Sequence, residues 1–426
     1  MTNERRNTPD ATHALPTPAR LLIAAVALCL ASWLAWASLR AGVSRFAAEH
    51  ALRTRAPAEA ELAARLAPSD PDAHFALAWL RSNAGDAEGA RRAYERALEL
   101  RPRDHVLWLE LGQLLERGGD TEGALGALGR AAELAPHYAQ PRWHLGHALL
   151  RAGRTEAAFA ELRRAAEADP SLYPNLLQAV WHASGKDAAA LVRVADPRTT
   201  GETLAVVSFL VKAGTAADGL RLLRERGAAL TPEARRALVA DLIAVEEFGA
   251  AYEVWAEGRG ASGAAFADGG FEAAARTDAE DFGWRFARDT QTLRFSLDSD
   301  APREGARSLK VEYAGASEPS AHAVSQLLAV EPGARYRLTF SARSSELVTG
   351  GPPFVEVVSA SKTGGALAAA PPLPRATDGW RDFSLEFNAP PSGAVRVLLR
   401  RAPCASAPCP AFGSLWLDAF ELRRLS

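Results

Sequence analysis

The sequence predicts a multidomain protein with one N-terminal transmembrane helix, an all-α solenoid of repeated hairpins and a C-terminal all-β antiparallel sandwich. Three observations predict this order: an uncharged apolar run near the N-terminus, a repeat of 34 residues, and a change from helical to alternating apolar periodicity near residue 265. A length of 426 residues, at about 150 per domain, also requires more than one hydrophobic core.

The composition argues against two classes of protein. The 49 basic and 51 acidic residues sum to a net charge of −2, so no overall positive field attracts a phosphate backbone, and nucleic acid is not an expected partner. With 48% apolar and 23% charged residues, the chain has the composition of a folded globular protein and not of a disordered one.

Residues 21–39 form the uncharged apolar run, between Arg20 and Arg40. As a helix this run is about 28 Å long, close to the hydrocarbon thickness of a bilayer. We therefore expect a transmembrane helix at 21–39 after a cytoplasmic tail at 1–20. The alternative is a cleavable signal peptide, because residues 35–37, Ala-Trp-Ala, have the form of a signal peptidase site. Arginines flank the run on both sides, so their count does not decide its orientation.

Small residues and prolines carry the 34-residue repeat. Gly85, Gly119 and Gly153 have this spacing. The same spacing relates Ala90, Ala124 and Ala158, then Ala97, Ala131 and Ala165, and finally Pro102, Pro136 and Pro170. Each unit is expected to contain two amphipathic helices around the glycine, and proline ends the second helix because its ring cannot continue one. One pair of helices cannot bury its own apolar face, so the repeat predicts a stacked solenoid with an inner groove.

These residues resemble the tetratricopeptide repeat (TPR). The match includes Trp108, Leu111, Gly112, Ala124, Leu128, Ala131 and Pro136 in the second unit, and Leu145, Gly146, Ala158, Ala165 and Pro170 in the third. The resemblance implies TPR repeats over residues 56–171, of which Ala56, Ala63 and Pro68 belong to the second half of a degenerate first unit. It also implies that the groove binds a protein partner.

Between residues 172 and 258 the repeat loses its register, and we expect degenerate TPR-like helical hairpins. Turns similar to those of the repeats occur at residues 213–215, Ala-Gly-Thr, and at Gly249. Residues 231–233, Thr-Pro-Glu, predict a helix start, because they offer an N-cap, a first-turn proline and an acid that favours the helix dipole. The Gly-rich residues 259–264 are expected to be a linker, since their G-x-G-x-x-G match does not follow a strand.

One face of the first helix in each repeat is expected to line the groove, because side chains four residues apart share a helix face. The candidates are Phe75, Trp79 and Asn83, then Leu109, Gln113 and Arg117, and then Trp143, His147 and Arg151. Related proteins that hold acidic peptide ends have a Lys/Asn/Arg clamp here, from which Phe75 and Trp79 depart. We expect a partner segment with both apolar and acidic residues. The alternative is that the aromatic residues pack between helices.

After residue 265, apolar residues alternate with polar ones, as in Leu309, Val311 and Tyr313. The pattern recurs at residues 293–297, 336–342, 383–387, 395–399 and 416–422, with Pro and Gly turns between the segments. Such spacing predicts an antiparallel sandwich of eight or more strands.

The order of features in this segment resembles the calcium-containing jelly-roll carbohydrate-binding modules of the galactose-binding-like fold. The similar segments are residues 269–272, Gly-Gly-Phe-Glu, residues 305–311, and residues 417–420, Leu-Asp-Ala-Phe. The resemblance implies a jelly-roll domain at 265–426 and polysaccharide binding.

Asp418 carries the metal prediction, because alternation places it on the same side of its strand as Trp416 and Phe420. A carboxylate on an apolar face needs a partner that offsets its desolvation. With Glu272 it could share a structural Ca²⁺, as the resemblance implies, although Ala419 replaces the usual second acid. No other cofactor is expected.

Glycan binding needs flat aromatic faces for the C–H side of a pyranose. The candidates are Trp284, Tyr313 and Trp380. The alternative for each is a place in the core of the sandwich.

Cys404 and Cys409 lie in a Pro/Ala-rich segment with no further ligand spaced for zinc. A disulfide between them would contribute about 2 kcal/mol and needs an oxidising compartment such as the periplasm. Two free thiols are the alternative.

The sequence contains no G-x-S-x-G, H-E-x-x-H or P-loop motif, so we do not expect an enzyme. We expect a single-pass protein of the bacterial cytoplasmic membrane, with most of the chain in the periplasm, that acts as a scaffold in surface polysaccharide assembly or export. The alternative is a general protein–protein adaptor whose sandwich is structural or binds protein.

Overall fold

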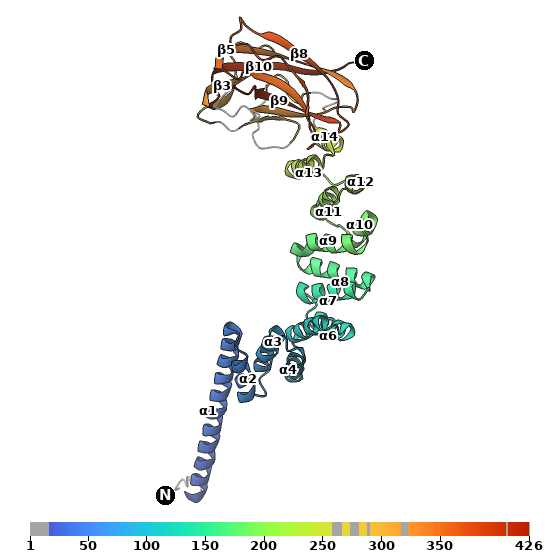
Figure 1. Ribbon diagram of the computed structural model, residues 1–426. Helices are drawn as coiled ribbons and strands as arrows, with labels where there is room; N and C mark the ends of the chain where they lie inside the picture. Colours follow the sequence, from blue (N-terminus) through green and yellow to red (C-terminus); the bar gives the residue numbers. More distant parts are fainter. Residues whose placement is uncertain are drawn as a thin grey trace, which may run out of the picture. The chain divides into compact units, whose positions relative to one another are not determined.

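The fold is that of a computed structural model, which describes residues 17–257, 266–272, 281–287, 290–316, 323–405 and 408–425. The chain divides into two compact units, residues 1–196 and 197–426, which we describe separately (Figure 1). The predicted fold class is confirmed: one apolar N-terminal helix, a helical solenoid and a C-terminal antiparallel sandwich. The predicted linker at 259–264 lies outside the described residues.

The described part of the first unit is helical. Its elements are α1 (Thr17–Thr54), α2 (Pro57–Leu66), α3 (Pro71–Asn83), α4 (Ala87–Leu100), α5 (His105–Arg117), α6 (Thr121–Leu134), α7 (Ala139–Arg151), α8 (Thr155–Ala168), a 3₁₀ turn at Pro170–Leu172, α9 (Tyr173–Ala183) and α10 (Ala188–Ala195). Consecutive helices pack as hairpins, α3 on α4, α5 on α6 and α7 on α8, and successive hairpins stack (Figure 1).

Helix α1 extends well beyond the predicted transmembrane helix and continues without a break to Thr54. Its C-terminal half packs on α2, where the guanidinium Nε of Arg40 donates to the Leu66 carbonyl at 3.0 Å and the Ser44 hydroxyl donates to the Ala63 carbonyl at 3.0 Å. This half of α1 is therefore the first helix of the degenerate first unit. The sequence predicted only the second helix of that unit, because the apolar run conceals where the repeat begins.

Aspartates and glycines at repeated positions define the hairpins. The side chains of Asp70, Asp86, Asp104 and Asp120 each cap a helix by accepting a backbone N–H of its first turn. Between the two helices of each repeat, Gly85, Gly119 and Gly153 have φ angles of 84°, 82° and 73°, a left-handed conformation that glycine adopts without strain. The 34-residue spacing thus has a direct local cause.

The second unit begins with four helices, α11 (Thr200–Lys212), α12 (Ala216–Arg226), α13 (Pro232–Ala244) and α14 (Phe248–Ala256). Thr231 caps α13 as predicted, since its hydroxyl accepts the Ala234 N–H at 3.2 Å. The turn predicted at Gly249 is wrong, because Gly249 lies inside α14. The chain turns earlier, where Glu246 has a φ of 65°.

Ten described strands then form two antiparallel five-stranded sheets. They are β1 (Trp284–Phe286), β2 (Leu293–Asp298), β3 (Ser308–Ala316), β4 (Val324–Ala329), β5 (Arg335–Thr349), β6 (Pro353–Ser359), β7 (Ala366–Ala369), β8 (Arg381–Asn388), β9 (Ala394–Arg401) and β10 (Pro410–Leu425). The strand orders are β1-β4-β9-β6-β7 and β2-β3-β10-β5-β8. Alternate side chains of both sheets fill one core between them.

A bulge in β10 changes the side on which its residues lie. Ala419 has a φ of 52°, and the pairing with β5 shifts between Asp418 and Glu421. Phe420 therefore points into the core, whereas Trp416 alternates with the core residues Leu415 and Leu417. The expectation that Phe420 shares a side with Trp416 and Asp418 is wrong, because strict alternation does not hold across a bulge.

Helix α14 packs on the sheet that contains β4. The rings of Tyr252 and Trp255 lie 5.2 and 5.6 Å from the ring of Phe282, between centroids. After β6, the ammonium group of Lys362 donates to the Ala244 carbonyl at the end of α13, at 2.9 Å. The last helical hairpin is thereby attached to the sandwich.

Candidate binding sites

The first helices of the repeats place most of the predicted groove residues at least partly at the surface. Asn83, Arg117 and Arg151 are exposed. Gln113, Trp143 and His147 are half-buried. Leu109 is a correction: it is 3% exposed and packs in the core with Leu125 and Leu128, so it cannot contact a partner.

Phe75 and Trp79 are half-buried against the core of the first repeats. The ring of Phe75 lies 6.3 Å from the ring of the fully buried Tyr94, and the Trp79 carbonyl accepts a hydrogen bond from the Asn83 amide at 2.7 Å. Both aromatic residues therefore serve the packing of helices while presenting part of their surface. Their role in binding a partner stays a prediction.

Polar side chains on the first helices of successive repeats contact one another. Arg117 donates to the Ser82 hydroxyl at 2.8 Å, and Arg151 donates through Nε to Glu116 at 2.8 Å. The amide nitrogen of Gln113 lies 3.4 Å from Nε2 of His144. Each of these pairs joins one repeat to the next, so the side chains form a ladder along the solenoid.

An interacting pair on neighbouring repeats, Tyr94 and Glu110, was not predicted from the sequence. Burial raises the pKa of the Tyr94 hydroxyl and also raises the pKa of the half-buried Glu110 carboxyl. Arg117 acts on both groups in the opposite direction. No sequence motif marks the pair, because it joins the second helix of one repeat to the first helix of the next.

The sandwich places the three glycan candidates in different surroundings. Trp284 and Tyr313 are core residues, 7% and 4% exposed, and the Trp284 indole donates to the Asp268 carbonyl at 2.7 Å. Their ring faces are closed to a sugar, which corrects two of the three predictions. Trp380 is half-buried at the surface, and its indole donates to the Ala301 carbonyl at 2.9 Å.

The two predicted calcium ligands, Glu272 and Asp418, approach each other beside Gly270. A Cβ atom on Gly270 would be 3.7 Å from Oδ1 of Asp418 and 3.8 Å from Oε1 of Glu272. Asp418 is fully buried, and burial raises its pKa. The sequence resemblance therefore locates a real cluster of acidic groups.

Backbone amides, however, occupy this cluster. Oδ2 of Asp418 accepts N–H groups of Arg303 and Glu304 at 2.8 and 3.1 Å, and Oδ1 accepts that of Ala419 at 2.7 Å. Oε1 of Glu272 accepts the N–H of Ala306 at 2.9 Å. We call this arrangement the amide clasp.

The amide clasp does not fit a calcium ion. Calcium takes six to eight oxygen ligands, including carbonyls, whereas the segment around Gly305 turns N–H groups toward the acids. Within the described residues, no group of three or more His, Cys, Asp or Glu side chains could hold a metal. The same N–H donors that balance the carboxylates would repel a cation.

Cys404 and Cys409 form a disulfide that closes the segment before β10. The buried guanidinium of Arg401 supports it, donating to the Cys409 carbonyl at 2.9 Å and to the Thr349 hydroxyl at 2.8 Å. The Gly351 carbonyl also accepts from Arg401, at 3.1 Å. Neither the side chain of Arg401 nor its partners could be assigned from the sequence.

Comparison with known families decides the identity of the solenoid. The family model of the tetratricopeptide repeat matches residues 75–139 and 118–173. Residues 75–173 are tetratricopeptide repeats. In the TPR array, the half-buried and exposed side chains of α3, α5 and α7 thus lie on the first helices of successive repeats.

Solved structures are similar over less than half of the chain. A structure of pilF from Pseudomonas aeruginosa is 18% identical with a TM-score of 0.34, covering 45% of this chain and 95% of that one. YrrB, a TPR protein with an unusual peptide-binding site, is 19% identical with a TM-score of 0.26, covering 40% and 74%. A CBM4 structure is 13% identical with a TM-score of 0.28, covering 38% and 99%. No curated protein matches the chain.

Acid is expected to destabilise the TPR array through His144 and His147. Burial lowers the pKa of both imidazoles, and the charge of Arg151 acts in the same direction. The unfolded chain therefore binds more protons just below the ordinary histidine pKa of about 6.5, and stability falls as the pH drops through that value. We expect the thermal midpoint to decrease between pH 7.5 and 5.5, and to decrease less in a His144→Gln, His147→Gln variant. Equal decreases in both proteins would contradict this.

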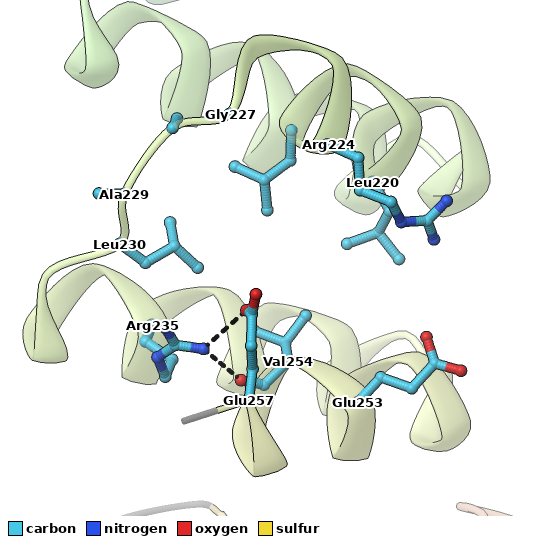
Figure 2. Close-up of a pocket in the computed structure, with 11 residues that line it drawn as sticks. Leu220, Arg224, Gly227, Ala229, Leu230, Arg235, Glu253, Val254 and Glu257 are labelled. Carbon is cyan, nitrogen blue, oxygen red and sulfur yellow. Dashed lines mark hydrogen bonds and ion pairs between the residues drawn. The ribbon is translucent and has the colours of Figure 1, made fainter. Parts of the chain in front are cut away.

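Beyond the TPR array, α12, α13 and α14 enclose a cavity of about 630 Å³ (Figure 2). Its apolar lining comes from Leu220, Leu230 and Val254, and Figure 2 shows Arg235 bonded to Glu257 and to the Val254 carbonyl. Arg235 thereby fastens α13 to the end of α14. Arg235, one of the two arginines that line the cavity, is therefore used to hold the last two helices together.

Proposed function

We propose that this chain is a membrane-anchored scaffold of the bacterial envelope, with most of its mass in the periplasm. Its TPR array binds a protein partner, its sandwich binds glycan, and it works in surface polysaccharide assembly or export without catalysing a reaction. The observation that carries the proposal is that one helix, α1, contains the apolar run and also packs as the first helix of the TPR array.

Helix α1 supports the membrane anchor. The stretch Leu21–Thr54 is long and apolar enough to cross a bilayer, and its most apolar part is not buried by the protein. Exposed Trp33 and Trp36 lie near its end, where indoles favour the bilayer interface. Arg40 and Ser44 bind α2, so the anchor and the first repeat share one rigid helix.

The disulfide supports the periplasmic side. Disulfides persist in oxidising compartments and are rare in the cytoplasm. Cys404 and Cys409 are bonded, whereas Cys29, within the apolar helix, is free. This distribution is the one expected if the helix crosses the membrane and the sandwich lies outside the cytoplasm.

The alternative is a general adaptor whose sandwich is structural or binds protein. The burial of Trp284 and Tyr313 favours it, because two aromatic faces expected for sugar serve the core. The two proposals differ only in what the sandwich binds, and both keep a protein partner on the TPR array.

A fusion of alkaline phosphatase after Ser426 tests the topology, because this enzyme is active only where its disulfides form. We expect activity in cells and loss of that activity when residues 17–39 are deleted. Fusions active in neither case would contradict the periplasmic assignment. Retention of the full chain on columns of envelope polysaccharide separates the scaffold from the adaptor, which would pass through unretarded.

A further inference from the structure

The outer face of sheet β2-β3-β10-β5-β8 carries a row of aromatic and cationic side chains. Lys310, Trp416 and Arg343 are direct partners on the adjacent strands β3, β10 and β5. The guanidinium carbon of Arg343 lies 4.3 Å from the ring centroid of Trp416 and 5.5 Å from that of Trp380. The ammonium group of Lys310 lies 5.5 Å from the Trp416 ring centroid. We call these four side chains the Trp–Arg platform.

Both indole rings of the platform are held in place by the end of β2 and the segment that follows it. The Trp416 N–H donates to the Asp298 carboxylate at 2.6 Å, and the Trp380 N–H donates to the Ala301 carbonyl at 2.9 Å. The same segment continues into the amide clasp, where Arg303 donates its N–H to Asp418. The side chains of the platform are therefore held in position before a ligand binds, so binding would cost little side-chain conformational entropy.

Arg343 keeps capacity to bind an anion. Among the described residues no salt bridge joins it to a carboxylate. Its Nε is buried, so a ligand could reach only its Nη groups, of which Nη2 donates to the Asp300 carbonyl at 3.4 Å. Asp298 is close enough for their charges to interact, but it accepts its hydrogen bonds from Trp416 and the Asp300 N–H. By contrast Arg335, earlier on the same strand, is paired with Glu386 at 2.6 Å.

The outer face of the opposite sheet is covered at β4 and β9. Leu327 and Leu398 alternate with core residues and so point outward from the sandwich, yet each is only 2% exposed. Helix α14 packs on β4, and Lys362 fastens the hairpin that contains α14. An extended ligand is therefore more easily placed on the face that carries Trp416.

We infer that the Trp–Arg platform binds an acidic polysaccharide through a uronic acid residue, with a pyranose C–H face on the indole rings and the sugar carboxylate on Arg343, because Lys310 is already paired with Glu312 at 2.8 Å. A guanidinium donates two parallel hydrogen bonds to a carboxylate, and aromatic faces suit the apolar side of a pyranose. The inference rests on the proposed glycan-binding function and specifies its site and its class of sugar.

Affinity electrophoresis of the full chain in detergent tests this inference. The probes are polygalacturonate, alginate and a glucuronate polymer, with galactan, mannan and glucan as neutral counterparts. We expect retardation by at least one acidic polymer and not by the neutral ones. Trp416→Ala and Arg343→Gln should each weaken it about tenfold or more, since each removes one of the two contacts.

The control is Arg335→Gln, which removes a positive charge from the same strand and face but away from the tryptophans; its retardation should stay within about twofold of the wild type. Circular dichroism and the thermal midpoint establish that each variant is folded, and Trp416→Leu, which keeps apolar volume without an aromatic face, replaces Trp416→Ala if the latter is not.

Three results would contradict the inference in different ways. Retardation that is equal for neutral and acidic polymers, or unchanged in both platform variants, would contradict the platform as the binding site but leave the proposed glycan binding intact. Unretarded passage through all six polymers would contradict both the platform as a binding site and the proposed glycan binding. Loss of a protein partner from the folded Trp416 variant, without any effect on glycan, assigns the face to protein and also overturns the inference.

Discussion

Gly146→Val is expected to destabilise the TPR array by about 3 kcal/mol, among the largest effects of any single substitution in it. A Cβ atom at this position would lie 2.6 Å from Cγ of Leu162 and 3.2 Å from the Ala158 carbonyl oxygen. Leu162 and Ala158 are fully buried in the facing helix, so neither can move aside without shifting the helix. Urea unfolding followed by circular dichroism measures the loss.

Gly126→Ala is the matched control. Gly126 also lies in a helix of the array, α6, but a Cβ atom there would meet nothing within 4 Å. Alanine is the better helix former, so this variant should be more stable than the wild type by up to about 1 kcal/mol. A Gly146→Val protein as stable as the wild type would contradict the close packing of α7 on α8 that defines the repeat.

Asp418→Ala is expected to destabilise the sandwich by about 3 kcal/mol, because it removes the carboxylate that accepts the N–H groups of Arg303, Glu304 and Ala419. Each amide loses a charge-assisted hydrogen bond to a side chain that is fully buried. Glu421→Ala, on the same strand but exposed, should change stability by less than about 0.5 kcal/mol.

Calcium separates the amide clasp from a metal site. If the amides alone balance Asp418, the thermal midpoint of the wild-type protein should be the same in EDTA and in millimolar Ca²⁺. A rise in midpoint with Ca²⁺ that disappears in Asp418→Ala would show that the acids bind a cation, and that the N–H groups turn away to admit it.

The repeats could be predicted from the sequence because their determinants are local. Gly85 and its equivalents permit the turn, aspartates cap the helices, and small residues allow close packing, all at one spacing. The start of the array could not be predicted in the same way. Helix α1 is both the apolar run and the first helix of a hairpin, and only the contacts of Arg40 and Ser44 with α2 reveal the second role.

The candidate sites of the sandwich depended on contacts that no spacing encodes. Trp284 and Trp416 both lie on strands of the sandwich, yet one is in the core and the other is on the outer face. Asp418 and Glu272 were correctly brought together by family resemblance, but their N–H donors come from backbone. Nearly every residue type has a backbone N–H, so the sequence does not show which amides bind the two acids. The resemblance therefore implied calcium as their partner.

Site-specific photo-crosslinking in intact cells tests most directly the claim that the TPR array is a membrane-bound scaffold for a protein partner. A photoreactive amino acid replaces Gln113 or His147 on the first helices, or the exposed Arg130 on α6 as the control. The account predicts one discrete adduct from both first-helix positions, recovered in the membrane fraction, and no such adduct from position 130. Equal labelling at all three positions, or an adduct found only in the soluble fraction, would contradict it.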